Sequence, residues 1–193
     1  MKKYWTDEPE NALVLNCDFR GSPGGRIVEA GWLLLARNVV VQHRKQDGIP
    51  HVKRGVPMPF RYSGDLRLLK DRPHFGSGQC VDLIKELVLG LKGVSTQTWK
   101  QGATVKASPN LIRGTAIATF GPDGKYPTAD TGQHAAIFVA HAGAGFYVVE
   151  QYRKSGLVLC RHMGLPQGEW KQRPDGTWPQ RSKNQYAFSV IER

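Results

Sequence analysis

Two side chains in this sequence could together carry nucleophilic catalysis, a cysteine at position 80 and a histidine at position 134. Cys80 follows the turn residues 75–78 and opens a segment, Gln79–Leu91, whose apolar side chains recur at three- and four-residue steps. This spacing predicts an amphipathic helix. A thiol in the first turn of a helix lies near free N–H groups and the positive end of the helix dipole, which favour the thiolate. Cys80 is therefore a candidate nucleophile.

A thiol nucleophile needs an imidazole within reach, and a third polar group must hold the tautomer of that imidazole. Of the six histidines, His134 is the best placed because it opens the apolar segment 134–141 directly after a Thr-Gly-Gln loop. His141, at the other end of this predicted strand, faces the opposite side by alternation. We therefore interpret His134 as the general base.

The third group should lie on the neighbouring strand of a hairpin closed by the sequence Ala-Gly-Ala-Gly. If the hairpin turns about Gly143, Glu150 lies opposite Ala136 and shares a face with His134. If the centre lies half a residue later, Gln151 takes that face instead, because a one-residue slip reverses the faces of a strand. A carboxylate stabilises an imidazolium better than an amide does, which favours Glu150, but the spacing alone leaves both residues open.

The remaining elements that position these side chains are predicted mainly as strands. Residues 95–110 read as a loop, with a turn at Lys-Gln-Gly, and a helix cap is expected near Ser77 or Gly78. Alternating or apolar short runs predict strands at 115–120, 134–141, 146–152, 156–162 and 185–191. A helix followed by consecutive strands, without regular alternation, indicates an α+β fold.

The chain divides into two parts at the sequence level. Residues 71–193 hold all of the candidate site residues and are predicted to be the catalytic domain. Residues 1–70 are interpreted as an N-terminal extension of uncertain structure that packs on this domain. Within the extension, residues 31–42 are apolar enough for a buried helix or strand, and periodicity does not decide between the two.

Composition limits the classes of function. Lys and Arg exceed Asp and Glu by 11, which favours a polyanionic partner such as an acidic cell-wall polymer or a nucleic acid. A basic nucleic-acid-binding module is the alternative of another class, with Trp170, Trp178 and Tyr186 as candidate stacking residues. No recognised nucleic-acid-binding motif accompanies them, so this partner is disfavoured.

Three cysteines, without any CxxC pair, predict neither a disulfide framework nor a zinc site, and we expect no metal and no cofactor. No apolar run reaches 18 residues, so no membrane span is expected. The N-terminus has no apolar core of the kind found in a secretory signal. A protein made in the cytoplasm without a signal would act in the periplasm or on the cell wall only after export by a route other than the general secretory one.

Four segments resemble the CHAP and NlpC/P60 families of cysteine amidases. Gly78-Gln79-Cys80, at the head of an apolar helix, resembles their nucleophile motif, and the segment 134–138 resembles their His-led strand. Residues 149–152 are similar to the Val-Glu-Gln-Asn stretch of CHAP amidases, and residues 114–120 to the Gly-led strand of NlpC/P60 proteins. The resemblance covers roughly residues 71–155. It departs from the CHAP pattern at Tyr152, where many members have Asn.

This resemblance implies a papain-like α+β fold in which the nucleophile-bearing helix packs on an antiparallel β-sheet. It makes Cys80 the nucleophile, His134 the base and Glu150 the orienting acid, with Gln79 and Gln151 as supporting or alternative residues. The implied function is hydrolysis of amide bonds in peptidoglycan peptides by thiol acyl transfer, as an amidase or endopeptidase. An acyltransferase or an amidase acting on another substrate is the alternative.

Trp99–Gly102 and the strand at 114–120 are most similar to a bacterial branch of this superfamily. Some relatives in that branch are amidase toxins exported by type VI secretion, which would suit a protein without a signal peptide. This branch implies peptidoglycan as the substrate and a cognate immunity protein as a further partner.

Overall fold

The segment that begins at Cys80 folds as predicted into a helix. In the computed structural model, which describes residues 59–129, 132–166 and 171–193, helix α2 comprises Cys80–Leu87. It is shorter than expected, because the chain leaves the α-conformation at Val88 and makes a 3-10 turn over Leu89–Leu91. The N-cap residue is Gln79, directly after Gly78.

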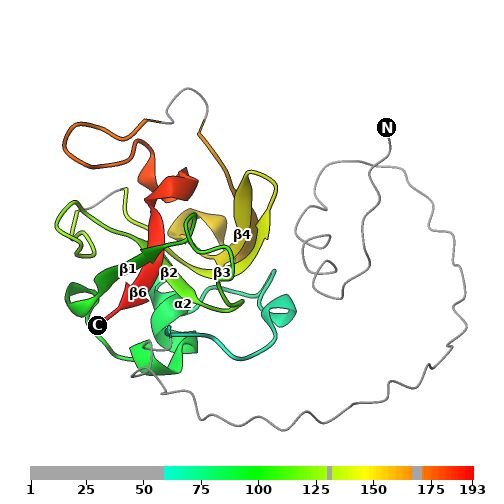
Figure 1. Cartoon of the computed structure of the whole chain (residues 1–193). Coiled ribbons are helices and arrows are strands. Elements are labelled where there is room, and N and C mark those ends of the chain that lie inside the picture. The colour runs from blue at the N-terminus through cyan, green and yellow to red at the C-terminus, as the bar shows by residue number, and fades with distance from the viewer. Residues whose placement is uncertain (1–58, 130–131, 167–170) are drawn as a thin grey trace, which may run out of the picture. The chain divides into compact units, whose positions relative to one another are not determined.

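A six-stranded sheet with strand order β1-β6-β2-β3-β4-β5 forms the other layer, and every neighbouring pair is antiparallel. The strands are β1 (Lys100–Thr104), β2 (Ala116–Thr119), β3 (Ala135–Ala142), β4 (Gly145–Glu150), β5 (Leu159–Met163) and β6 (Phe188–Glu192). Five of them lie where the sequence predicted strands. Figure 1 shows α2 beside the strands of this sheet. The described residues thus form an α+β arrangement with few helices.

Strand β1 was not predicted, since its segment was interpreted as loop. Its sequence is Lys-Gln-Gly-Ala-Thr, and none of its five residues is buried. It is an edge strand whose neighbouring strand in the described sheet is β6, where Lys100 lies opposite Glu192. An exposed edge strand needs no apolar alternation, so the pattern that reveals half-buried strands is missing here.

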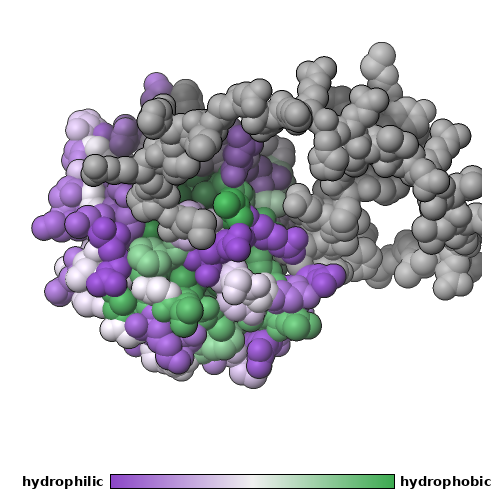
Figure 2. Space-filling model, turned by 60° about the horizontal axis from the view of Figure 1, so that its bottom comes forward, coloured by the Kyte–Doolittle hydropathy of each residue, from purple (hydrophilic) through white to green (hydrophobic). Residues whose placement is uncertain are grey.

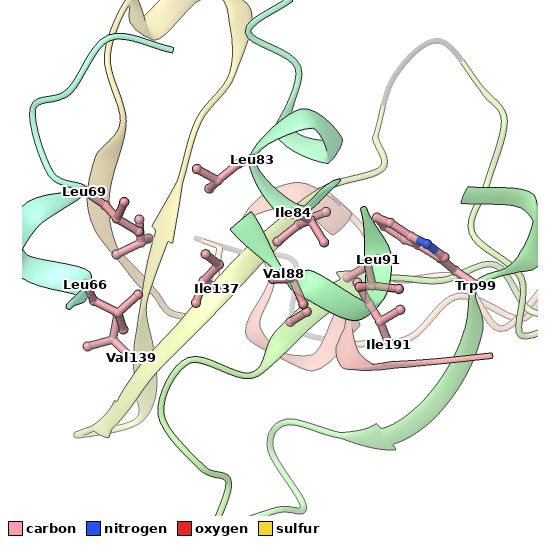
Figure 3. Packing of buried hydrophobic residues seen from close by; sticks show 14 of the residues in the cluster. Leu66, Leu69, Leu83, Ile84, Val88, Leu91, Trp99, Ile137, Val139 and Ile191 are labelled. Atoms are coloured by element: carbon pink, nitrogen blue, oxygen red, sulfur yellow. The ribbon is translucent and has the colours of Figure 1, made fainter. Parts of the chain in front are cut away.

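Two groups of buried apolar side chains cover the two faces of the sheet. The larger group joins Leu83 and Ile84 of α2 to Ile137 and Val139 of β3, and Figure 3 shows these side chains within the cluster. The smaller group contains Phe138, together with partners on β4, β5 and β6. Burial of large side chains on both faces stabilises the sheet and holds α2 against it. Because Cys80 is at the start of α2, this packing also fixes the position of the thiol.

Residues 59–70 belong to the same core as the segments that follow. The backbone N–H of Tyr62 donates to the carbonyl of Gly114, and that of Ala116 donates to the carbonyl of Phe60. Leu66 and Leu69 are buried in the larger apolar group. Residues 59–70 therefore pack on the sheet and on α2, as expected for the part of the predicted extension that the structure describes. The rest of the predicted extension, with the apolar segment 31–42, lies outside the described residues.

The outer surface of the described residues is mixed in character. Figure 2 shows hydrophilic residues interspersed with apolar areas on one face. None of the helices in the described ranges combines the length and apolarity that crossing a membrane requires.

Candidate active site

His134 is held in place by the strand beside it. Its backbone N–H donates to Oγ1 of Thr119 at 2.9 Å, and the N–H of Thr119 donates to the carbonyl of His134 at 2.9 Å. His134 is 5% exposed, and its imidazole lies edge-on to Phe188, with 6.2 Å between ring centroids. His134, the residue before β3, is thus held through its backbone by Thr119 and through its ring by Phe188. By contrast, His141 lies away from this site and donates from Nε2 to the carbonyl of Ser108 at 2.9 Å.

The thiol of Cys80 lies beside this imidazole. Cys80 is a free cysteine of intermediate exposure, and its side chain is hydrogen-bonded with His134. The backbone N–H of Ala135 also donates to the sulfur, and the hydroxyl of Tyr126 lies 3.8 Å from Sγ. Among the other cysteines, Cys160 is disulfide-bonded and Cys17 lies outside the described residues.

The turn before α2 depends on a glycine. Gly78 has a φ of 82°, and a Cβ at this position would lie 2.5 Å from Nδ1 of His74. A larger residue would therefore be strained by its backbone conformation and would displace the His74 ring. Gly78 allows the chain to enter the helix directly at Gln79 and Cys80.

Glu150 completes the arrangement from the end of β4. Nε2 of His134 donates to Oε2 of Glu150 at 2.6 Å, which leaves Nδ1 of the imidazole for Cys80. Arg161 on β5 donates from Nε to Oε1 at 2.5 Å and from a terminal nitrogen to Oε2 at 2.9 Å. The side chain of Glu150 is fully buried, so these charged partners replace the water that a carboxylate would otherwise require.

Gln151 is also buried, but it has a different task. Its Nε2 donates to the carbonyls of Phe75 and Gln79, each at 2.8 Å, and its Oε1 accepts from the N–H of Phe75 at 2.9 Å. The amide therefore ties the loop before α2 to the end of β4. Between the two alternatives that the sequence left open, the structure places Glu150 on the imidazole and Gln151 on this loop. Gln79 is exposed, and its carbonyl accepts one of these hydrogen bonds.

The electrostatics favour a thiolate–imidazolium pair. Burial opposes the charge on Cys80, but the hydrogen bond and charge of His134, with the Ala135 N–H and the Tyr126 hydroxyl, leave the thiol pKa below its ordinary value. Burial likewise opposes the charge on His134, yet Cys80 and Glu150 raise the pKa of the imidazole to about 9. Between these two pKa values the sulfur is negative and the ring is positive.

Glu150 is ionised for the same kind of reason. Burial alone would raise the pKa of this carboxyl, but His134 and then Arg161 lower it below its ordinary value. A buried carboxylate that receives two cationic partners stays charged and can stabilise the imidazolium. The sign of every shift is thus set by the direct contacts between these side chains.

A pocket of about 960 Å³ opens over the thiol and the imidazole. Its walls include Gln79 and Cys80 from the start of α2, together with Tyr126 from the loop between β2 and β3. A substrate amide placed in this pocket would meet the sulfur, the imidazole and the hydroxyl of Tyr126. Within the three described ranges, no group of three or more His, Cys, Asp or Glu residues is placed to hold a metal ion.

Sequence reasoning did not select three side chains that build this site, namely Thr119, Tyr126 and Arg161. Each of them touches a candidate residue that lies 11 to 46 positions away in the chain. For Arg161, the predicted strand at 156–162 places a cation beside β4, and a buried carboxylate requires a cation. Tyr126 follows a turn and carries no pattern that would have pointed to it.

The fold and the geometry define a class before any comparison is made. A cysteine at the start of a helix, an imidazole on the adjoining antiparallel sheet and a carboxylate behind the imidazole form the arrangement used by thiol hydrolases. The comparisons with known proteins then identify the family. Residues 61–175 match the family described as Dae2, domesticated amidase effector 2, and the chain belongs to this family.

The individual relatives agree with the family. The chain is 34% identical over 140 residues to a type VI secretion amidase effector 2 protein of Salmonella typhi, covering 70% of this chain and 100% of that protein. It is 40% identical over 76 residues to the domesticated amidase effector 2 of Ixodes scapularis, covering 38% of this chain and 50% of that protein.

A solved structure is similar as well. The type 6 secretion amidase effector 2 (Tae2) has a TM-score of 0.61 and 31% sequence identity, covering 69% of this chain and 94% of that chain. At this identity the likeness extends beyond the shared fold to the sequence.

Proposed function

We propose that this protein is a cysteine amidase that hydrolyses amide bonds in the peptides of peptidoglycan. The observation that carries the proposal is the contact of the Cys80 thiol with His134, which is itself held by Glu150, at the base of an open pocket. Membership of a family whose relatives are named amidase effectors supports amide hydrolysis over other uses of such a site. The excess of basic residues suits an anionic wall polymer.

In the first half of the reaction, the Cys80 thiolate attacks the carbonyl carbon of the substrate amide and forms a carbon–sulfur bond. The negative charge that develops on the carbonyl oxygen is stabilised by the backbone N–H of Cys80, which has no helical partner in the first turn of α2. The hydroxyl of Tyr126, a neighbour of the sulfur, is the candidate second donor. His134 then gives its proton to the leaving amine, the carbon–nitrogen bond breaks, and a thioester remains.

In the second half, water attacks the thioester carbon while His134 accepts a proton from that water. The carbon–sulfur bond breaks, the carboxylic acid product leaves, and the proton on His134 restores the initial ion pair with the thiolate. Glu150 contacts neither substrate nor sulfur, and its role is to orient and stabilise the imidazolium. Arg161 acts one step further back, because it holds Glu150.

The fold fits the same proposal. We infer a papain-like architecture from the helix that carries the nucleophile and the antiparallel sheet that carries the base, as in the CHAP and NlpC/P60 families. We further propose delivery by type VI secretion to the periplasm of a target cell, where peptidoglycan lies, and a cognate immunity protein as a partner. The names of the relatives motivate these last proposals.

Two of the three candidate stacking residues of the nucleic-acid alternative lie against each other. The rings of Trp178 and Tyr186 stack on one another at 5.1 Å with an interplanar angle of 19°, so each ring already has an aromatic neighbour. Trp170, the third candidate, lies outside the described residues.

The deciding experiment incubates purified peptidoglycan sacculi with the wild-type protein and with Cys80→Ala, and identifies the released fragments by mass spectrometry. We expect the wild type to release peptides with a new amino group and a new carboxyl group, and the variant to release none. The melting temperature of Cys80→Ala should stay close to that of the wild type. Equal release by both proteins would contradict the proposal.

A further inference from the structure

The pocket above Cys80 is cationic. Three basic side chains, Arg153, Arg161 and Lys183, contribute to its wall, and the described residues that line it include no Asp or Glu. Such a one-sided distribution of charge in a concave site raises the local concentration of anions and repels cations. The pocket is therefore suited to a substrate that carries negative charge close to the amide to be cleaved.

Only two of the three cations are available for that charge. Arg161 is committed to Glu150 and donates a further hydrogen bond to the carbonyl of Ser182 at 3.2 Å. Arg153 and Lys183 are exposed, and within the described part of the chain neither is paired with an acidic side chain. These two side chains are thus free to contact a ligand in the pocket.

Their positions in the fold are unrelated in sequence but meet at this site. Arg153 begins the 3-10 turn that follows β4, three residues after Glu150. Lys183 ends the 3-10 turn Arg181–Lys183, next to Ser182, whose carbonyl accepts from Arg161. The turn that carries Lys183 therefore contacts the buried charge network that holds His134, and the turn that carries Arg153 follows Glu150 closely along the chain.

The chemistry of the two cations selects among anions. A guanidinium presents a planar fork of N–H donors that matches the two oxygens of a carboxylate, and an ammonium supplies a compact point charge beside it. An amidated substrate offers a neutral carboxamide, whose NH₂ group would face donors. We propose that Arg153 and Lys183 bind a free carboxylate of the substrate, so that the enzyme prefers acidic peptides whose carboxyl groups near the scissile amide are not amidated.

This proposal rests on the proposed function, since it names the substrate class of the same site. Because Arg153 and Lys183 are exposed, water screens their interaction and the expected discrimination is modest, about 5- to 20-fold. The carboxylate is bound in both the ground state and the transition state, so the effect should be mainly on KM and only weakly on kcat.

The test uses a purified peptidoglycan fragment and the same fragment after conversion of its free carboxylates to carboxamides. We expect wild-type kcat/KM to be about 5- to 20-fold higher on the acidic fragment. The double variant Arg153→Gln with Lys183→Gln should lose this preference. Its kcat/KM should fall on the acidic fragment and stay unchanged on the amidated one. Lys154→Gln is the matched control, because Lys154 is an exposed neighbour that does not line the pocket, and it should keep the preference.

Alkylation of Cys80 by iodoacetamide at wild-type rate shows that the site of the double variant is intact. Equal wild-type cleavage of both fragments, or a double variant that still prefers the acidic one, would overturn the carboxylate proposal while leaving amide hydrolysis in place. If Lys154→Gln loses the preference for the acidic fragment as fully as the double variant does, the carboxylate proposal is also overturned. The cause would then be the overall charge of the protein. A wild-type protein that cleaves neither fragment would overturn the proposed function itself, and the carboxylate proposal with it.

Discussion

Arg161 holds Glu150 by both carboxylate oxygens, with Nε at 2.5 Å from Oε1 and a terminal nitrogen at 2.9 Å from Oε2. The two residues lie on neighbouring strands, and Glu150 is fully buried whereas a third of the Arg161 side chain is exposed. A fork of this geometry fixes the plane of the carboxylate as well as its charge. The direction in which Glu150 accepts from His134 is therefore set by Arg161.

The first prediction follows from this fork. Arg161→Gln should lower kcat by about tenfold, because Glu150 loses its fixed orientation and the imidazolium loses part of its stabilisation. Arg161→Lys keeps the positive charge but not the two-pronged geometry of the guanidinium. Its kcat should therefore lie between those of Arg161→Gln and the wild type. Steady-state kinetics on peptidoglycan fragments measure both. If only KM rises in Arg161→Gln, the residue binds substrate directly and does not act through Glu150.

The second prediction concerns pH. The pKa of the Cys80 thiol is lowered and that of His134 is raised to about 9, so the ion pair exists between the two values. The rate of Cys80 alkylation should reach its plateau at a lower pH than that of an ordinary thiol, whose pKa is about 8.5. Hydrolysis should decline above about pH 9, when His134 loses the proton it gives to the leaving amine.

The control for the pH profile is the same protein unfolded in guanidinium chloride, where Cys80 should titrate as an ordinary thiol. Alkylated peptides identified by mass spectrometry assign the rate to Cys80. Identical profiles for folded and unfolded protein would show that the fold does not activate this thiol.

The hairpin formed by β3 and β4 shows how far sequence reasoning could go. Near the tip Ala142 pairs with Gly145, so the turn is centred between Gly143 and Ala144, half a residue beyond Gly143. Continued along regular strands, this register would have directed Gln151 toward the imidazole. The composition of the turn predicted a hairpin correctly but could not supply the register at its far end.

A shift in pairing between Phe138 and Ala140 changes the register inside this hairpin. On the His134 side of the shift, Ile137 pairs with Val149. The same register places Glu150 opposite Ala136, on the face of the strand that His134 shares. Bulges of this kind occur where a strand must bend or redirect a side chain, and an apolar strand gives no local indication of them. The sequence therefore favours Glu150 through the chemistry of its carboxylate, since counting residues from the turn leaves both Glu150 and Gln151 open.

The elements themselves were more predictable than their contacts. The helix at Cys80 and the strand after His134 follow from periodicity, because each must bury one face. The neighbours of the sulfur come from distant parts of the chain, and Tyr126, whose hydroxyl lies 3.8 Å from the sulfur, is 46 positions away from Cys80. Non-local contacts of this type have no short-range pattern, so a single sequence does not reveal them.

The third prediction tests Tyr126. Its ring packs edge-on against Trp99 and Phe120, with centroids 5.2 Å and 6.5 Å away, so Tyr126→Phe should preserve the packing and remove only the hydroxyl. If this hydroxyl donates to the oxyanion, kcat should fall by about 10- to 100-fold with little change in KM. Thermal unfolding provides the check on the fold. Wild-type kcat in this variant would remove Tyr126 from the mechanism.

The fourth prediction separates the two buried residues at the end of β4. Glu150→Gln removes the charge that stabilises the imidazolium but keeps the shape, so kcat should fall by about 10- to 1000-fold and the pKa of His134 should drop. Gln151→Ala leaves the N–H of Phe75 and the carbonyls of Phe75 and Gln79 without their partner. That loss should lower the free energy of unfolding by about 2–4 kcal/mol, with a smaller effect on the turnover of the folded protein.

Two measurements on both variants distinguish these roles. Urea unfolding gives stability, and turnover is measured at a temperature where each variant is fully folded, so loss of folded protein does not count as loss of catalysis. Because Glu150 raises the pKa of His134, the alkaline limb of the pH–rate profile should move to lower pH in Glu150→Gln and stay in place in Gln151→Ala. A purely structural role for Glu150 would leave that limb unmoved. The opposite result would assign the orienting role to Gln151. In that case Glu150→Gln would keep the wild-type turnover and alkaline limb, and Gln151→Ala would be folded but inactive.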